Sequence, residues 1–295
     1  MQTVCLFVVI KGDAMHTVEL NSGTIHYETA GPSTGRPLVF IHGYAMGGSL
    51  WRPLSARLAR HGLRCIVPTW PLGAHQQAMR PSADMTMRGV AAMVAEFLDK
   101  AGLDDLVLVG NDTGGAVAQV VATEFPDRLG ALVLTSCDAF EHFPPPILAP
   151  FITAAKVPPL WRIAVQGMRS RTVRRRAYGA LAHTNLDALT AEWTRKAVRD
   201  RAIAENLRRF TGSLTRQTTL EAAAKLPQFT KPALIAWSAD DAFFPQEDGR
   251  RLAAALPNSR LEIIAGARTF SMLDQPDALA GLIAEFATTA STVGG

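Results

Sequence analysis

A tight turn rich in glycine joins an apolar run to a segment of helical composition near the middle of this chain. The run is Leu106-Val107-Leu108-Val109, and the turn after it is Gly110-Asn111-Asp112-Thr113-Gly114-Gly115. Continuous apolar runs of this length are typical of parallel strands covered on both faces. Glycines on either side of Asp112 allow a strained backbone at the aspartate and close packing of the helix on the strand. The turn therefore predicts a strand, a sharp bend that carries a carboxylate, and a helix.

The same alternation of strands and helices runs through most of the chain. Strands are expected at residues 17–20, 23–30, 37–41, 64–68, 106–110, 132–135, 233–237 and 261–264. Helices are expected at residues 51–61, 86–102, 115–125 and 245–256, and from about residue 276, with Thr86 as an N-cap and Gly102 at a C-terminal cap. This pattern predicts an α/β fold with a mostly parallel eight-stranded sheet and helices on both faces.

The alternation stops between residues 139 and 228. Proline clusters open this segment, and its composition is helical without a good strand. From Lys156 to Arg216 the sequence carries 14 Lys or Arg residues against four Asp or Glu residues, which suits either an anionic substrate or a solvated helical face. We predict a helical cap at 139–228, inserted into a core of residues 15–138 and 229–295. Residues 1–14 read as an N-terminal extension ahead of a more natural start at Met15, and the alternative for their apolar run is an extra edge strand.

Composition narrows the classes of partner and compartment. The formal net charge is only +4, without a long basic tail, so nucleic acid is not an expected partner. The apolar start, residues 1–10, is shorter than the roughly 20 residues of a membrane span and lacks the features of a secretory signal. The three cysteines suit neither a disulfide framework nor a zinc site. We expect a cytoplasmic protein with reduced thiols, no metal, no cofactor and no membrane partner.

Three motifs together resemble the α/β-hydrolase superfamily over about residues 15–288. The turn around Asp112 resembles the nucleophile elbow of that family, Gly-x-nucleophile-x-Gly between a strand and a helix. His42-Gly43 resembles its oxyanion loop, and the segment from Trp237 to Pro245 resembles its acid-bearing loop, with Asp241 in the acid position. Aspartate instead of serine at the elbow resembles the branch of haloalkane dehalogenases and epoxide hydrolases.

The resemblance implies a chemistry for these residues. The Asp112 carboxylate would attack an sp³ carbon, displace a halide or open an epoxide, and form an alkyl-enzyme ester. The N-terminus of the following helix favours the ionised carboxylate. The backbone N–H groups of Tyr44 and Thr113 would form the oxyanion hole, and Asp241 would orient a histidine that activates water to hydrolyse the ester. No cofactor is implied.

The sequence departs from this pattern at the histidine. In Gly266-Ala267-Arg268-Thr269-Phe270, Thr269 stands in the histidine position, and threonine cannot act as a base near neutral pH. Without another base the ester would persist, because general-base help is worth about 10²–10⁴-fold in rate. Haloalkane dehalogenases bind the leaving halide with an Asn and a Trp, and this chain has Tyr44 and Thr113 at those two positions. Epoxide hydrolases have a proline in the motif His-Gly-x-Pro and ring-opening tyrosines in the cap. This chain has Ala45 at the proline position, and Tyr178 is the one tyrosine of its predicted cap.

Several residues are candidates for the missing partner of the elbow aspartate. His75 follows the fourth strand, at the edge where ligands bind in open α/β sheets, although it reads more simply as a solvent-exposed loop histidine. Asp138 stands where some family members place their acid, or caps the following turn. His142 is a further candidate, but it and His183 read more simply as cap surface. His42 reads as a structural part of its loop.

Three functions remain open from the sequence. The first is a hydrolase of a small, largely apolar substrate with Asp112 as nucleophile or base. The second is a lyase, isomerase or cyclase in which burial makes Asp112 a stronger general base. The third is a ligand-binding protein without catalysis. The apolar cap residues either line a pocket or pack in the cap, and cap helices in this fold also mediate homodimers; these residues are Trp161, Ile163, Trp193 and Leu207.

Overall fold

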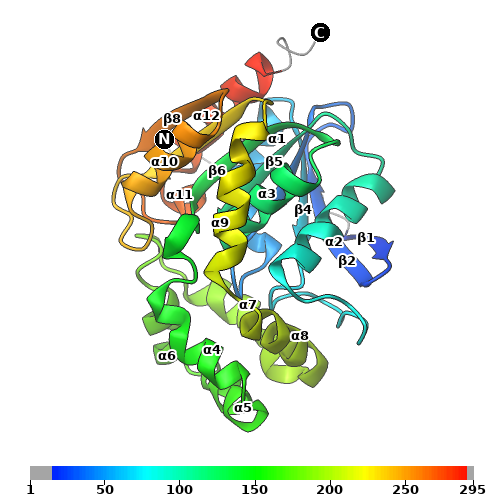
Figure 1. Ribbon diagram of the computed structural model, residues 1–295, viewed down its shortest axis with the longest axis vertical. Helices are drawn as coiled ribbons and strands as arrows, with labels where there is room; N and C mark the ends of the chain where they lie inside the picture. Colours follow the sequence, from blue (N-terminus) through cyan, green and yellow to red (C-terminus); the bar gives the residue numbers. More distant parts are fainter. Residues whose placement is uncertain (1–14, 291–295) are drawn as a thin grey trace, which may run out of the picture.

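The computed structural model describes residues 15–290, which form an eight-stranded sheet with helices on both faces (Figure 1). The strand order is β1-β2-β4-β3-β5-β6-β7-β8. The β1–β2 and β2–β4 pairs are antiparallel, and all the other neighbours are parallel. The strands are β1 (His16–Leu20), β2 (Gly23–Ala30), β3 (Pro37–Ile41), β4 (Arg64–Thr69), β5 (Leu106–Asp112), β6 (Leu129–Cys137), β7 (Ala233–Ser238) and β8 (Ser259–Ile264).

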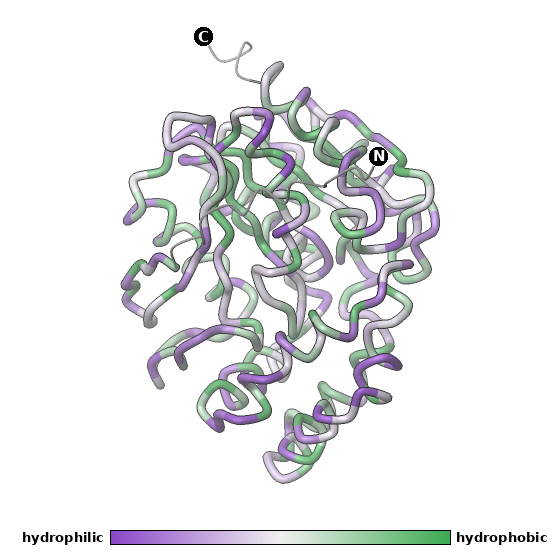
Figure 2. Tube along the Cα trace, turned by 180° about the vertical axis from the view of Figure 1, so that it is seen from behind, coloured by the Kyte–Doolittle hydropathy of each residue, from purple (hydrophilic) through white to green (hydrophobic). Residues whose placement is uncertain are grey.

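Helices cover the two faces because alternate side chains of the inner strands point in opposite directions. On β3, Val39 and Ile41 belong to the core beneath α2 and α3, whereas Leu38 and Phe40 belong to the core beneath α1 and α12. Figure 2 shows hydrophobic stretches through the inner strands. The core helices are α1 (Arg52–Arg60), α2 (Met87–Lys100), α3 (Thr113–Glu124), α10 (Gln246–Ala255), α11 (Ser271–Asp274) and α12 (Pro276–Thr289).

The segment between β6 and β7 contains helices and no strand, as its composition predicts. Five of these helices gather together in the lower part of Figure 1, away from the sheet. The sixth, α9 (Arg216–Lys225), packs on α3 instead, beside the sheet. The five are α4 (Ala149–Ala155), α5 (Pro158–Gly167), α6 (Arg171–Tyr178), α7 (Asp187–Arg199) and α8 (Arg201–Gly212).

The predicted fold class is confirmed, and the differences are at the ends of elements. The Thr86 hydroxyl accepts the N–H of Gly89 as the predicted N-cap of α2, and Gly102 follows that helix with a φ of 61°. β6 begins at Leu129, earlier than predicted, because Leu129 already pairs with Leu106 of β5, ahead of a shift in register. β5 continues to Asp112, and α3 starts at the next residue, so the turn is shorter than the sequence predicts.

Some predictions fall outside the described residues or concern features that the described residues lack. The proposed N-terminal extension, residues 1–14, lies outside the described part, as do residues 291–295 of the predicted core. Between residues 15 and 290, no helix is long and apolar enough to cross a membrane. The same residues contain no group of His, Cys, Asp or Glu side chains that could hold a metal ion. Cys65 and Cys137 are buried free thiols.

Candidate active site

Asp112 lies at the sharp bend between β5 and α3. Its backbone has a φ of 54° and a ψ of −137°, which residues other than glycine rarely adopt. A Cβ at Gly110 would lie 2.7 Å from the carbonyl oxygen of Gly114, and a Cβ at Gly114 would lie 2.3 Å from the carbonyl oxygen of Ile41. The close packing that needs these glycines holds the strained bend in place, and the Asp112 side chain lines a pocket beneath the cap.

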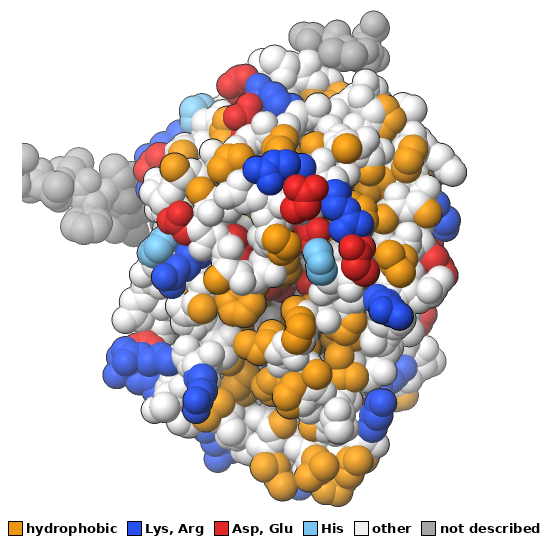
Figure 3. All heavy atoms as spheres, turned by 60° about the vertical axis from the view of Figure 1, so that its left-hand side comes forward, with side chains coloured by type: hydrophobic (Ala, Val, Ile, Leu, Met, Phe, Trp, Pro, Cys, Tyr) orange, Lys and Arg blue, Asp and Glu red, His pale blue; other side chains and the backbone are white. Residues whose placement is uncertain are grey.

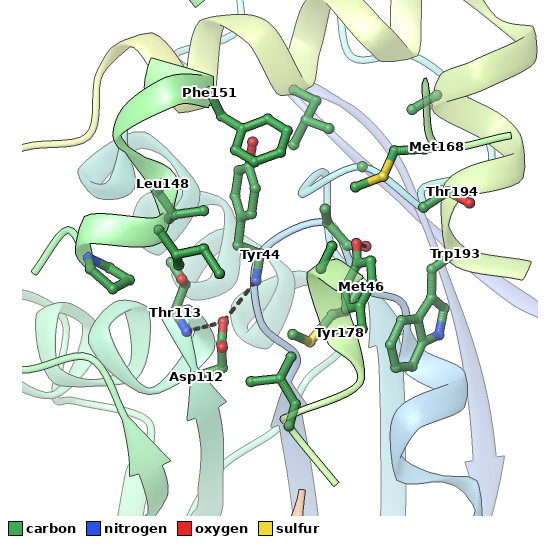
Figure 4. Close-up of a pocket in the computed structure, with 18 of the residues that line it drawn as sticks. Tyr44, Met46, Asp112, Thr113, Leu148, Phe151, Met168, Tyr178, Trp193 and Thr194 are labelled. Carbon is green, nitrogen blue, oxygen red and sulfur yellow. Dashed lines mark hydrogen bonds between the residues drawn. The ribbon is translucent and has the colours of Figure 1, made fainter. Parts of the chain in front are cut away.

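Two backbone N–H groups bind the same oxygen of the Asp112 carboxylate (Figure 4). Oδ1 accepts the N–H of Tyr44 at 3.1 Å and the N–H of Thr113 at 2.6 Å. A Cβ at Gly43 would lie 2.2 Å from Oδ1, so only glycine lets the loop after β3 approach the carboxylate this closely. The two residues named from the sequence as oxyanion-hole donors therefore meet at Asp112, and they leave its Oδ2 without a bond to either N–H group.

Burial sets the protonation of the Asp112 carboxyl. Desolvation raises its pKa from the usual 3.8 to about 6, although the N–H groups of Thr113 and Tyr44 act in the opposite direction. The negative charge of Asp241 adds to the increase. With a pKa of about 6, the carboxylate is mostly ionised at neutral pH, and it is also a stronger base than an exposed aspartate.

Asp138 lies next to Asp112 in the pocket, directly after β6. The Thr113 hydroxyl donates a hydrogen bond to its Oδ2 at 2.8 Å, and the Asp138 N–H bonds the Asp112 carbonyl oxygen at 3.3 Å. Only 2% of Asp138 is exposed. Burial and the charge of Asp112 raise the pKa of the Asp138 carboxyl well above its usual range. Thr113 therefore links two buried carboxyl groups, one through its N–H and the other through its hydroxyl.

The acid loop contains Asp241, and Thr269 takes the place of a histidine beside it. The Thr269 hydroxyl donates to Asp241 Oδ1 at 3.0 Å, and the N–H groups of Phe243 and Phe244 donate to the same oxygen. Burial raises the pKa of Asp241. Asp241 is not among the side chains that line the pocket. It therefore holds its own loop and Thr269, and it acts on Asp112 through its charge.

His75 is buried, so the reading of it as an exposed loop histidine is wrong. Its Nε2 lies 3.2 Å from Asn206 Oδ1, on helix α8, and it does not line the pocket that contains Asp112. Burial lowers the pKa of His75 to about 4 and keeps it neutral. Asn206 Oδ1 also accepts the N–H of Met79. This asparagine therefore joins α8 to the loop after β4 that contains His75 and Met79. The structure does not bring His75 to the elbow.

The other histidines have structural or surface positions. His42 Nε2 accepts the N–H of Trp70 at 2.9 Å, so the ring proton is on Nδ1, which lies 3.0 Å from the Gly43 carbonyl oxygen. This agrees with the structural reading of His42. His142 pairs with Asp248, and the side chain of His183 pairs with Asp240; both histidine side chains are about half exposed. The pocket around Asp112 is lined by no histidine in the described chain.

The pocket itself is lined almost entirely by apolar side chains from the cap and the core (Figure 4). Trp161, Trp193 and Leu207 line it, as one of the two sequence readings expects, whereas Ile163 is 71% exposed and points away. Further lining residues could not be predicted, because helical spacing alone does not tell which side of a cap helix faces the core. These are Leu148, Phe151, Val165 and Met168, with Phe243 and Phe244 from the acid loop.

The arginines of the cap lie on its surface. Arg171 and Arg175 pair with Asp187, and Arg208 pairs with Glu205. No Lys or Arg side chain of the described residues lines the Asp112 pocket. In Figure 3 hydrophobic side chains spread over the lower half of the molecule, with Lys and Arg around them. The basic composition of the cap therefore reflects a solvated face.

Asn111, next to Asp112, is a buried polar residue of the turn whose role was not predicted from the sequence. Its amide nitrogen donates to the carbonyl oxygens of Ser136 at 3.1 Å and Thr269 at 2.9 Å. The amide thus ties the loop that carries Thr269 to the end of β6. A polar residue directly after the apolar run Leu106–Val109 and Gly110 is the one sequence signal for this role.

Comparisons with known proteins identify the family and its relatives. The family model described as the alpha/beta hydrolase fold matches residues 36–276. Haloalkane dehalogenase 2 of Mycobacterium bovis is 28% identical over 269 residues, which cover 89% of this chain and 91% of that protein. A 2-hydroxy-6-oxononadienedioate/2-hydroxy-6-oxononatrienedioate hydrolase of Dechloromonas aromatica is 24% identical over 276 residues, 90% of each chain.

Solved structures show the same fold. Haloalkane dehalogenase DbeA from Bradyrhizobium elkani superposes with a TM-score of 0.77 at 16% identity, over 96% of this chain and 100% of that chain. The epoxide hydrolase CorEH superposes with a TM-score of 0.75 at 19% identity, over 94% and 99%. The relatives similar in sequence are hydrolases, which supports a hydrolase in general terms. The chain belongs to the α/β-hydrolase family and is similar to its haloalkane dehalogenase-like branch.

Proposed function

We propose that the protein is a hydrolase of a small, largely apolar and uncharged substrate, with Asp112 as the attacking carboxylate. The observation that carries this proposal is the binding of Oδ1 by the N–H groups of Tyr44 and Thr113 at the floor of an apolar pocket. One carboxylate oxygen is held by two donors, and the other can react. The pocket would bury an apolar substrate directly above that oxygen.

The held oxygen suits both halves of an ester route. When Oδ2 attacks an sp³ carbon, Oδ1 becomes the carbonyl oxygen of the ester. When water attacks this ester, negative charge develops on Oδ1, where the two N–H groups already point. The site therefore needs no rearrangement of its donors between the two steps.

The charges of the pocket favour a neutral substrate over an anion. Asp112 and Asp138 both line it, and no cationic side chain of the described residues does. A substrate carboxylate would meet these groups without a partner, and burying an unpaired charge is costly. The dioate hydrolase from Dechloromonas aromatica is named for an anionic substrate. We therefore expect a substrate of lower polarity for this chain.

A second candidate function uses Asp112 as a general base in a lyase, isomerase or cyclase reaction. The observation that favours it is the burial of the Asp112 carboxyl group, which raises its pKa to about 6, close to the value of an efficient base near neutral pH. This function predicts turnover without any covalent adduct. A binding protein without catalysis would instead keep its ligand affinity after Asp112→Asn.

Intact-mass measurement after incubation with panels of haloalkanes and epoxides tests the proposal. We expect an adduct on the peptide that contains Asp112, together with slow release of the alcohol or diol. The matched control is Asp112→Asn, which keeps the shape of the side chain and should form no adduct. Turnover of a panel member without an adduct at any time would favour the general-base function. No adduct and no turnover over both panels would contradict the proposed hydrolase.

A further inference from the structure

We propose that Asp138 is the proton-transfer residue of this site. It acts as the acid that protonates the leaving atom when Asp112 attacks, and then as the base that activates water for hydrolysis of the ester. This inference rests on the proposed ester route through Asp112. It assigns to a carboxyl group the role that a histidine would have at the position of Thr269.

The position of Asp138 supports both roles. It lines the same pocket as Asp112, and Thr113 lies between the two carboxyl groups. Oδ2 of Asp138 accepts the Thr113 hydroxyl, so a proton on this carboxyl resides on Oδ1. Within the described part of the chain, Asp138 Oδ1 accepts no hydrogen bond. It is therefore available to a substrate atom or a water molecule in the pocket.

The other side-chain donors of the pocket are already used by the protein. The Tyr178 hydroxyl donates to the Ala45 carbonyl oxygen. The Tyr44 hydroxyl donates to Thr211 Oγ1, because that hydroxyl itself donates to a backbone carbonyl oxygen of α8. The remaining lining donors also have protein acceptors; they are Thr113, Trp161, Trp193 and Thr194. Among the described lining side chains, a protonated Asp138 is thus the one donor left for a leaving atom.

The charges around Asp138 change during the reaction. The charged groups that act on it are Asp112, on β5, and Asp248, on α10, and both oppose its ionisation. Asp248 is itself paired with His142 and Arg251. Ester formation removes the negative charge of Asp112 but leaves Asp248 unchanged. The ionised form of Asp138 is therefore favoured at the stage where a base is needed.

The steps balance for an epoxide substrate. Asp112 Oδ2 forms a bond to carbon, the C–O bond of the ring breaks, and the alkoxide takes the proton of Asp138. Water then adds to Cγ of Asp112 while ionised Asp138 accepts its proton, and the electron pair moves to Oδ1. When this tetrahedral intermediate collapses, the C=O bond to Oδ1 forms again and the bond between Cγ and the substrate oxygen breaks. The substrate oxygen takes the proton of Asp138. The proton left on the Asp112 carboxyl returns to Asp138, and the net reaction is epoxide plus water to diol.

The test compares the two half-reactions in Asp138→Asn and in the wild type, by quenched mass spectrometry of the ester on Asp112. Asparagine can still accept the Thr113 hydroxyl and donate to a leaving atom, but it cannot take a proton from water. We expect the ester to form and then to be hydrolysed about 10²–10⁴-fold more slowly than in the wild type. The control Asp240→Asn, at an exposed carboxylate of the acid loop, should hydrolyse it at the wild-type rate.

A pH profile separates proton transfer from a structural role. Hydrolysis of the wild-type ester should accelerate with pH as Asp138 ionises, whereas the profile of Asp138→Asn should be flat. Thr113→Val, which keeps the N–H on Asp112 but removes the hydroxyl on Asp138, should slow hydrolysis by about tenfold. Ester hydrolysis at the wild-type rate in Asp138→Asn would overturn the role of Asp138 and leave the proposed function intact. No ester in any variant, the wild type included, would overturn both.

Discussion

Replacement of Asp112 by Asn should stabilise the protein while it removes the nucleophile. The asparagine Oδ1 can accept the same two N–H groups, and asparagine tolerates a positive φ, so the bend is retained. What disappears is a buried ionisable carboxyl. The difference in the free energy of unfolding between the two proteins therefore reports the cost of burying that charge.

The size and the sign of this cost follow from the pKa. As the pH rises through 3.8 the unfolded Asp112 loses its proton, but the folded carboxyl keeps it until about pH 6. The folded state binds more protons in this window, so the stability of the wild type falls between about pH 4 and pH 6. A pKa difference of about two, at about 1.4 kcal/mol for each pH unit, corresponds to about 3 kcal/mol at neutral pH.

Urea unfolding of the wild type and Asp112→Asn at about pH 5 and about pH 7.5 measures this effect. We expect the variant to be more stable by about 2 kcal/mol at the lower pH and by about 3 kcal/mol at the higher pH. Asp240→Asn, at an exposed position, should differ from the wild type by less than about 0.5 kcal/mol at both. An Asp112→Asn protein that is less stable than the wild type, or a difference that does not grow with pH, would refute the reasoning.

The same contacts predict the outcome of three further experiments. The rate of ester formation on Asp112 should rise about tenfold for each pH unit below about 6 and level off above it, and a flat profile by quenched mass spectrometry would exclude the carboxylate as nucleophile. Gly43→Ala should abolish ester formation with an unchanged circular dichroism spectrum, because its Cβ would lie 2.2 Å from Oδ1; normal adduct formation would contradict the geometry. Asn111→Ala should lower the free energy of unfolding, measured in urea, by about 2–3 kcal/mol, because the buried carbonyl oxygens of Ser136 and Thr269 lose their donor. Equal stability of this variant and the wild type would mean that the amide does not hold the loop that carries Thr269.

The strands and the elbow were predictable because they depend on local patterns. The inner strands are buried on both faces, so they read as continuous apolar runs wherever they occur. The meeting of Tyr44 with Asp112 was predictable only from the resemblance to the α/β-hydrolase family. In the structure it arises because β3 and β5 are parallel neighbours whose carboxyl ends lie together. The glycines at 43, 110 and 114 mark close approaches that leave no room for a Cβ.

The residues that contact the candidate site residues or line the pocket depend on contacts between distant segments, and they were less predictable. His75 is buried because Asn206, on a cap helix, covers it, and nothing near His75 in the sequence indicates this. The spacing of α5 does not show that Val165 faces the pocket and Ile163 faces solvent, because both belong to the same apolar helix. The bond from Thr113 to Asp138 joins the first residue of α3 to the residue after β6, and these two residues lie 25 positions apart in the sequence.

A single turnover in heavy-oxygen water tests the central claim, attack by the Asp112 carboxylate, most directly. If water hydrolyses an ester at Cγ, the product carries an oxygen from the protein, and the peptide that contains Asp112 gains the heavy oxygen. We expect this labelling in a reaction with enzyme in excess over an epoxide or haloalkane. Heavy oxygen in the product of the first turnover, with an unlabelled Asp112 peptide, would contradict the account and show that water attacks the substrate directly.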